Sequence, residues 1–155
     1  MNSFHEDIKI MKLYHHVERV LNELDELGKD ESESLRVDEL AVFDQLHYHG
    51  TDAVDDAIRE TGINEQSSVL EIGSGLGGPA RYIARSTGAE VTALELQEDH
   101  HLMAVNLTKR CGLSGKVNHL RGDILTHLWS RVEFNVIVSW LALYHIPRRE
   151  HLLQK

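Results

Sequence analysis

The feature that most constrains this chain is a glycine-rich turn placed directly behind an apolar run. Residues 71–81 read EIGSGLGGPAR, with four glycines, and they follow Ser68-Val69-Leu70. A bare turn between a buried strand and a helix lets a ligand approach the main chain closely, because no side chains stand in its way. Pro79 suits the first turn of the helix, where its missing N–H is no loss. The turn therefore predicts a strand, loop and helix unit that binds a ligand.

Short runs rich in Val, Ile and Leu alternate with helical segments in the second part of the chain. Alternation of this kind is typical of a parallel sheet with crossover helices. It predicts the α/β class, with a Rossmann-like open parallel sheet of four strands flanked by helices. We expect strands at 68–72, 90–96, 117–121 and 134–140, helices at 79–87 and 98–111, a connection at 124–132 and the start of a helix at 149–155.

The first part of the chain is helical in pattern. Apolar residues recur at three- and four-residue steps over residues 6–27, which predicts an amphipathic helix that Gly28 ends. The polar segment 28–34 is interpreted as a mobile link. Further helices are expected at 37–46 and 52–61. Together these segments predict an N-terminal helical arm that also supplies a lid.

The net charge of −9 is unevenly distributed along the chain. Residues 1–66 hold 17 Asp and Glu against 6 Lys and Arg, whereas residues 67–155 hold 8 against 10. Neither part has the basic stripe expected of a nucleic-acid binder, so direct nucleic-acid binding is disfavoured. We divide the chain into an acidic helical arm and lid over residues 1–50 and a Rossmann-like domain over residues 51–155.

Neither the apolar runs nor the amino terminus predicts a membrane protein. No run approaches the roughly 20 apolar residues that span a bilayer. The amino terminus, MNSFHEDIKI, lacks the basic-then-apolar order of a secretory signal. A single cysteine, Cys111, cannot form an internal disulfide. The expected location is therefore the cytoplasm, with no membrane partner.

The spacing of the glycines narrows the ligand to a nucleoside-containing cofactor. Gly73-x-Gly75-x-x-Gly78 satisfies the dinucleotide fingerprint, and Glu95 follows about 20 positions later at the end of the next expected strand. Glu95 is placed to accept hydrogen bonds from ribose hydroxyls. A carboxylate at Glu71, at the exit of the first strand, repels a pyrophosphate and favours a cationic ligand. S-adenosylmethionine carries an ammonium and a sulfonium and no phosphate, so it is preferred to NAD or FAD.

These segments carry a family resemblance. VLEIGSGLGGPARYIA, residues 69–84, resembles the first motif of class I S-adenosylmethionine-dependent methyltransferases. The closest similarity is to the small-molecule branch with a GxGxGGPAR loop, which includes sarcosine/dimethylglycine, phosphoethanolamine, tocopherol and sterol methyltransferases. VTALELQ at 91–97, LRGDIL at 120–125 and FNVIVSWLALYHIP at 134–147 are similar to later family segments in the same order. The resemblance covers residues 67–147.

The resemblance implies a methyl transfer from S-adenosylmethionine to a small-molecule acceptor, with an amine nitrogen as the expected acceptor atom. It places Asp123 at the adenine amino group with Ile124 as an apolar flank, and Leu96 beside the adenine. Candidates for assisting or orienting the acceptor are His145, Tyr144 and Tyr48. The implied cofactor-binding residues are Glu71, Gly73, Ser74, Gly75, Gly77, Gly78, Glu95, Leu96, Asp123, Ile124 and Ser139.

Several of these residues have a second interpretation. Tyr48 and His49 either form a lid or only pack against the third helix.

The chain has 11 histidines, but the adjacent pairs His15-His16 and His100-His101 point about 100° apart on a helix, so no metal site is predicted.

The family sheet has seven strands in the order 3-2-1-4-5-7-6, and four are identifiable before Lys155. The alternative hypothesis is therefore a truncated, catalytically incompetent fragment that acts by cofactor binding or protein interaction. Its expected partner is a second copy, paired through the exposed sheet edge or the N-terminal helix. A nicotinamide-dependent dehydrogenase is a third hypothesis.

Overall fold

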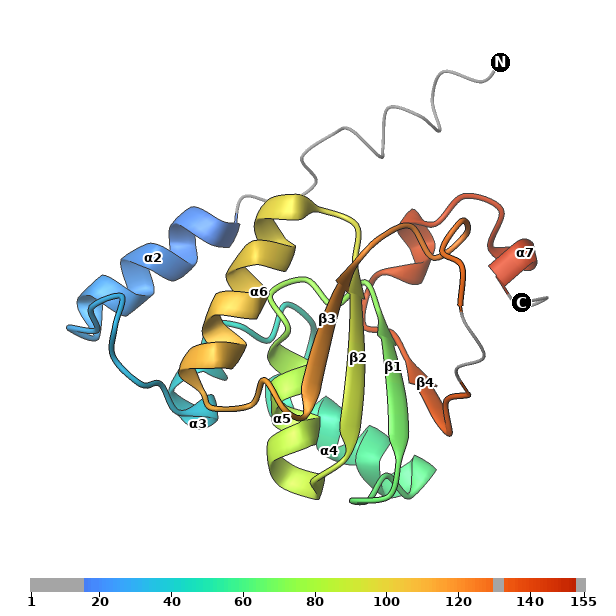
Figure 1. Cartoon of the computed structure of the whole chain (residues 1–155), viewed down its shortest axis with the longest axis horizontal. Helices are drawn as coiled ribbons and strands as arrows, with labels where there is room; N and C mark the ends of the chain where they lie inside the picture. The colour runs from blue at the N-terminus through green and yellow to red at the C-terminus, as the bar shows by residue number, and fades with distance from the viewer. Residues whose placement is uncertain (1–15, 130–132, 153–155) are drawn as a thin grey trace, which may run out of the picture.

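The computed structural model describes residues 16–129 and 133–152. Its centre is a parallel sheet of four strands in the order β3-β2-β1-β4 (Figure 1). This order and the parallel pairing confirm the predicted fold class. The strands are β1 (Ser68–Ile72), β2 (Glu90–Glu95), β3 (Val117–Arg121) and β4 (Val136–Val138).

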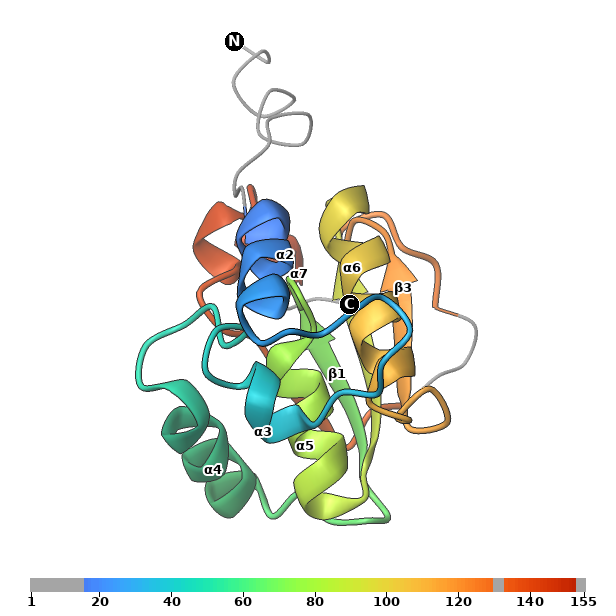
Figure 2. The ribbon, with the colours of Figure 1, turned by 90° about the vertical axis from the view of Figure 1, so that its left-hand side faces the viewer.

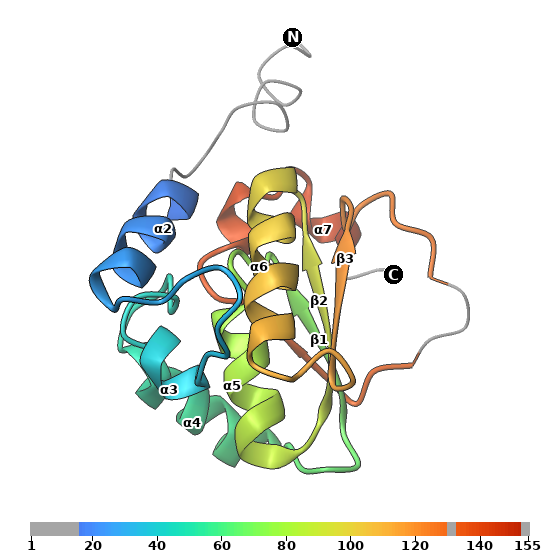
Figure 3. The same ribbon diagram turned by 60° about the vertical axis from the view of Figure 1, so that its left-hand side comes forward.

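The described helices α2 to α6 gather on one side of the sheet, and Figure 3 shows this layer beside the strands. Helices α5 and α6 contact the strands directly, while α4 and α3 pack on α5 and α2 packs on α6 (Figure 2). The helices are α2 (His16–Glu26), α3 (Val37–Leu40), α4 (Gly50–Thr61), α5 (Gly78–Thr87), α6 (Glu98–Arg110) and α7 (Arg149–Leu152), with a 3-10 turn at Leu143–His145.

The strand register sorts the core into two layers. Val69, Val91 and Val117 are aligned across β1, β2 and β3 and pack under the helices. Leu70 and Leu94 project to the opposite face, because successive side chains of a strand alternate between faces. There they pack against the connection between β3 and β4, through Ile124, Leu125, Trp129 and Phe134. The two layers keep β1 and β2 buried on both faces.

Two expected elements differ from the prediction. The helix expected over 37–46 ends at Leu40, and the chain turns so that Phe43 and Asp44 become buried. Strand β4 is shorter than 134–140, and the expected connection after β3 forms turns at 124–126. At the end of α3, long-range packing of Phe43 and Asp44 overrides the local helical pattern. The helix predicted over 6–27 is described from His16 onward, and its earlier part lies outside the described residues.

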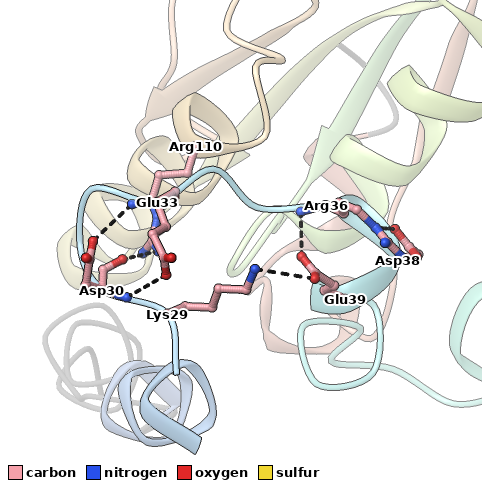
Figure 4. Close-up of polar contacts among 7 residues, drawn as sticks. All are labelled: Lys29, Asp30, Glu33, Arg36, Asp38, Glu39 and Arg110. Atoms are coloured by element: carbon pink, nitrogen blue, oxygen red, sulfur yellow. Dashed lines mark hydrogen bonds and ion pairs between the residues drawn. The ribbon is translucent and has the colours of Figure 1, made fainter. Parts of the chain in front are cut away.

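The link between α2 and α3 is fastened to α6, although it was predicted to be mobile. The Arg110 guanidinium donates hydrogen bonds to the main-chain oxygens of Glu33 at 2.9 Å and Asp30 at 2.5 Å (Figure 4). Lys29 forms an ion pair with Glu39 at 3.5 Å. The first contacts hold the link against the end of α6, and the ion pair joins it to α3.

In the part of the chain that the structure describes, none of the helices has both the length and the apolar character needed to cross a membrane.

The contact between α5 and the segment before α4 requires a glycine at position 78. A Cβ at Gly78 would lie 2.4 Å from the main-chain oxygen of Asp44, and Gly78 does not have a positive φ. We therefore expect Gly78→Ala to lower the free energy of unfolding by about 1–3 kcal/mol through overpacking. Urea denaturation measures the change.

Gly115→Ala is the matched control, because Gly115 also lacks a positive φ and has no atom within 4 Å of an added Cβ. Its free energy of unfolding should stay within about 0.5 kcal/mol of the wild type. Equal effects of the two substitutions would contradict the packing described at Gly78.

Candidate active site

A cavity lies where the carboxyl ends of the strands meet, the place where open α/β sheets bind ligands. Seven of the residues predicted from the sequence line it, and they come from four separate segments of the chain. The seven are Gly73, Gly75, Glu95, Leu96, Asp123, Ile124 and His145. Their neighbours in the lining include Leu46, Gln97, His100, Trp140, Leu141, Ala142, Ile146 and Pro147.

The glycine loop is tied to β2 at the edge of the cavity. The main-chain N–H groups of Gly73 and Ser74 both donate to the Leu94 oxygen, at 2.9 and 3.0 Å. Gly73 and Gly75 have φ values of 71° and 53°, the left-handed region that glycine enters without strain. The loop therefore presents main chain to the cavity. At Gly73 an added Cβ would lie 2.3 Å from the Ala142 Cβ, so this glycine also makes room for protein.

Glu95 is fixed in the cavity wall by two main-chain donors. Gly75 donates to its Oε2 and Gln97 donates to its Oε1, both at 2.8 Å. These two bonds orient the carboxylate and leave further lone pairs for a ligand hydroxyl. Glu95 lies at the end of the second strand, and its side chain is hydrogen-bonded to the glycine loop.

Asp123 is the second carboxylate of the lining, and its Oδ1 accepts a hydrogen bond from the Leu125 main chain at 2.9 Å. Among the described lining residues there is no lysine or arginine. Two carboxylates without a basic side chain favour a neutral or cationic ligand and disfavour a diphosphate. The electrostatic preference predicted for the site therefore comes from Glu95 and Asp123.

The structure corrects the position of Glu71, which was expected at the mouth of the cavity. Strand alternation places Glu71 on the helical face, in the cross-strand row with Ala93 and His119. The side chain is 1% exposed and is not part of the cavity lining. Burial raises the pKa of its carboxyl group well above 4.5, an effect that the nearby Arg81 guanidinium opposes. Glu71 thus lies in the interior and outside the cavity lining.

A buried polar cluster occupies this interior. Arg81 donates from Nη2 to Asp44 Oδ2 at 2.8 Å and from Nη1 to Thr108 Oγ1 at 3.1 Å, and Thr108 Oγ1 contacts His119 Nε2 at 2.8 Å. Burial, with the charge of Arg81, lowers the pKa of His119 to about 3. The ring is therefore neutral at physiological pH.

Gly77 and Gly78 serve this cluster and do not line the cavity. An added Cβ at Gly77 would lie 2.7 Å from His119 Cε1 and 3.0 Å from Arg81 Nη1, and one at Gly78 would meet Asp44. The two glycines therefore let the first turn of α5 approach the buried charges. The four glycines of the motif are divided between the cavity and the core.

The other predicted residues lie around the cavity and not in its lining. Ser74 is buried in the loop, and Ser139 donates to the Ile72 main-chain oxygen at 2.9 Å. Tyr48 and Tyr144 are 75% and 56% exposed. Only His145 of the three acceptor-side candidates lines the cavity, and burial lowers its pKa, which favours the neutral ring.

Two parts of the wall were missed from the sequence. Leu46 comes from the segment before α4, and Trp140 lies two residues after the end of β4. The imidazole of His47 stacks on the Trp140 ring, with centroids 5.1 Å apart and planes inclined by 24°. The position of Trp140 at the carboxyl end of a predicted strand was a usable signal. Nothing local in the sequence marks Leu46, because it reaches the cavity through tertiary contacts.

The lining fits S-adenosylmethionine. Two fixed carboxylates can accept hydrogen bonds from a nucleoside, and Leu96 and Ile124 provide apolar surface beside them. The lining combines two carboxylates, which can accept hydrogen bonds from an uncharged nucleoside, with an exposed main-chain turn that leaves room for an amino acid end. In the described residues, no group of three His, Cys, Asp or Glu side chains is placed to hold a metal ion.

Comparison with known proteins gives the family. A family model described as a methyltransferase domain matches residues 69–155. A sterol 24-C-methyltransferase of Neurospora crassa is 33% identical over 91 residues, which make up 59% of this chain and 24% of that protein. The chain thus spans about a quarter of the length of the curated relatives it matches.

Solved structures show the same fold. The MccD protein matches with a TM-score of 0.67 at 17% identity, covering 72% of this chain and 49% of that one. A methyltransferase of Thiobacillus denitrificans, solved in complex with S-adenosyl-L-homocysteine, matches with a TM-score of 0.61 at 19% identity, covering 79% and 51%.

The open parallel sheet of order β3-β2-β1-β4 is the fold of these solved structures. The chain belongs to the methyltransferase domain family. Membership of this family agrees with the predicted cofactor, S-adenosylmethionine.

The interior position of Glu71 makes stability depend on pH in a defined direction. A folded-state pKa raised above 4.5 contributes stability that is complete below pH 4.5 and is lost as pH rises through the folded pKa. Glu71→Gln removes this loss. The variant should therefore gain stability relative to the wild type as pH rises above 4.5, the ordinary pKa of the carboxyl group. Urea denaturation at a series of pH values measures the gain.

His119 titrates in both proteins, so its contribution cancels in the difference. Glu90→Gln, at an exposed carboxyl of β2, controls for the loss of a surface charge. A difference between Glu71→Gln and wild type that stays constant with pH would contradict the buried, proton-retaining state of Glu71.

Proposed function

We propose that this chain binds S-adenosylmethionine in the cavity and transfers its methyl group to a small-molecule acceptor. The observation that carries the proposal is the pair of fixed carboxylates, Glu95 and Asp123, beside a bare glycine loop in a cavity without basic lining residues. Membership of the methyltransferase domain family supports the same function.

In this proposal, one group of residues binds the nucleoside of the cofactor and another faces its amino acid end. In the first group, Glu95 accepts hydrogen bonds from the ribose and Asp123 accepts one from the adenine. Leu96 and Ile124 contact the adenine ring. The main chain at Gly73 and Gly75 faces the amino acid end. Bound cofactor supplies a methyl group on a sulfonium, an already activated carbon, so the protein contributes mainly by positioning and by excluding water.

His145 is the proposed group for the acceptor's proton. It lines the cavity, and burial lowers its pKa, which favours the neutral ring, the form that can act as a proton acceptor. Tyr144 lies beside it, with ring centroids 3.9 Å apart, and is proposed to orient the acceptor from the rim. Tyr48 has the same proposed role from the opposite segment. We propose an amine nitrogen as the acceptor atom, because an amine must lose a proton and a neutral histidine can accept it.

The apolar rim favours an acceptor with an apolar body. Leu141, Leu143 and Tyr144 are 40%, 42% and 56% exposed next to the cavity. Ile146 and Pro147 extend the same apolar surface into the lining. The sterol 24-C-methyltransferase relatives are named for an apolar substrate methylated at carbon, which makes an alkene carbon the second candidate acceptor.

Calorimetric titration with S-adenosyl-L-homocysteine tests the cofactor site. Asp123→Asn should weaken binding about tenfold or more, because it removes a charged acceptor worth about 1.5–3 kcal/mol. Asparagine retains one oxygen for the Leu125 N–H, so the loop should keep its shape. Glu98→Gln, on the exposed side chain paired with Arg121, is the control and should bind as the wild type does.

Methyl transfer is then measured with labelled cofactor on a panel of apolar amines and sterol-like alkenes. Turnover on either class supports the enzyme and identifies the acceptor atom. Cofactor binding without turnover on the panel favours the alternative, a fragment that acts by binding or by pairing with a second copy. Tight binding of NADH in place of S-adenosyl-L-homocysteine would support a dehydrogenase and contradict the proposal.

A further inference from the structure

We propose that residues 43–48, here called the strap, are held across the cavity by one continuous chain of contacts, and that Asp44, Gln45 and His47 are positioning residues for the cofactor. The identity of the ligand rests on the proposed function. The arrangement of the strap does not depend on it, because it follows from contacts within the protein.

The root of the strap is fixed by a buried ion pair. Arg81 is fully buried, and α6 orients its guanidinium through hydrogen bonds from Nη1 to Thr108 Oγ1 at 3.1 Å and to the Ala104 oxygen at 3.4 Å. The same guanidinium donates from Nη2 to Asp44 Oδ2 at 2.8 Å. Because Arg81 is held from α6 and lies on α5, Asp44 is bound to a fixed point of the domain.

Packing at the root joins the strap to the glycine loop. Phe43 is 6% exposed and packs in one cluster with Leu76, which belongs to the loop. The missing Cβ of Gly78 lets the Asp44 main chain lie directly on the first turn of α5. A displacement of the strap therefore alters the packing of the glycine loop, which faces the cavity.

The contacts continue from the root to the far wall of the cavity. Asp44 Oδ1 accepts a hydrogen bond from Gln45 Nε2 at 3.0 Å, and Gln45 Oε1 contacts His47 Nε2 at 3.1 Å. The His47 ring then stacks on Trp140, which lines the cavity after β4. The strap thus connects α5 on one side with the end of β4 on the other.

Leu46 lies between the two attachment points. It lines the cavity, and its Cδ1 is 3.4 Å from the position of a Cβ on Gly75, the glycine whose N–H holds Glu95. Only a strap fixed at both ends keeps Leu46 against this glycine. The contact chain therefore sets how well the cavity is closed over a bound cofactor, and opening of the strap precedes cofactor release.

Hydrogen exchange on the full chain without ligand tests the arrangement. Gln45→Met breaks the chain and leaves the Asp44–Arg81 pair intact, so it should fold. Exchange in residues 43–48 should rise about tenfold, as expected when a local segment opens without global unfolding. Amides of β1 and β2 should exchange as in the wild type. Asp44→Asn should have the same local effect or a larger one.

The dissociation rate of S-adenosyl-L-homocysteine provides the second measurement. It should rise about tenfold in Gln45→Met, because the closed population falls by about that factor. Val42→Ala is the control: Val42 precedes the strap, is 84% exposed and should leave both measurements unchanged.

Three results would overturn the proposal. One is unchanged exchange in the strap of Gln45→Met, and another is an equal rise in the strap and in β1. The third is a mobile strap with a dissociation rate equal to that of the wild type. If the wild-type chain does not bind S-adenosyl-L-homocysteine, the proposed function fails, and the exchange measurement still decides whether the strap is held as described.

Discussion

The buried ion pair between Arg81 and Asp44 is the interaction on which the rest of the site depends. A buried ion pair adds little net stability, because desolvation offsets the attraction, but it fixes geometry when its partners are hydrogen-bonded. Here Arg81 brings together α5, α6 and the strap. The surroundings avoid further charge, since burial favours the protonated form of Glu71 and the neutral form of His119. The pair thus joins the strap, with Leu46 near Gly75, to helix α5.

Much of the fold was predictable because it follows from local patterns. Apolar runs separated by helical segments predicted four parallel strands, and the order β3-β2-β1-β4 confirms the resemblance over that part of the sheet. Glu95 was placed in the cavity because residues at the carboxyl end of a parallel strand lie at that edge. The same strand alternation shows why Glu71 was misplaced. It is two residues after Val69, so it faces the helices with it, and this periodicity was readable from the sequence.

The remaining features depend on contacts between distant residues. The pattern over 37–46 indicates a helix, but Asp44 is drawn to Arg81, 37 residues away, and the helix ends at Leu40. Leu46 and Trp140 form the cavity wall only when β4 and the strap are both in place. The motif glycines also divide unexpectedly: two present main chain to the cavity, and two allow close packing on the buried cluster. A sequence motif shows that such glycines are present, but it does not show which neighbouring group requires each of them.

A crystal structure with S-adenosyl-L-homocysteine tests the central claim most directly. The account predicts the nucleoside in contact with Glu95 and Asp123, Leu46 over the cavity, and the Arg81–Asp44 pair unbroken. It also predicts that the Glu71 carboxyl group stays inside the domain and out of contact with the ligand. A ligand bound outside this cavity, or bound in it with the Arg81–Asp44 pair separated, would contradict the account.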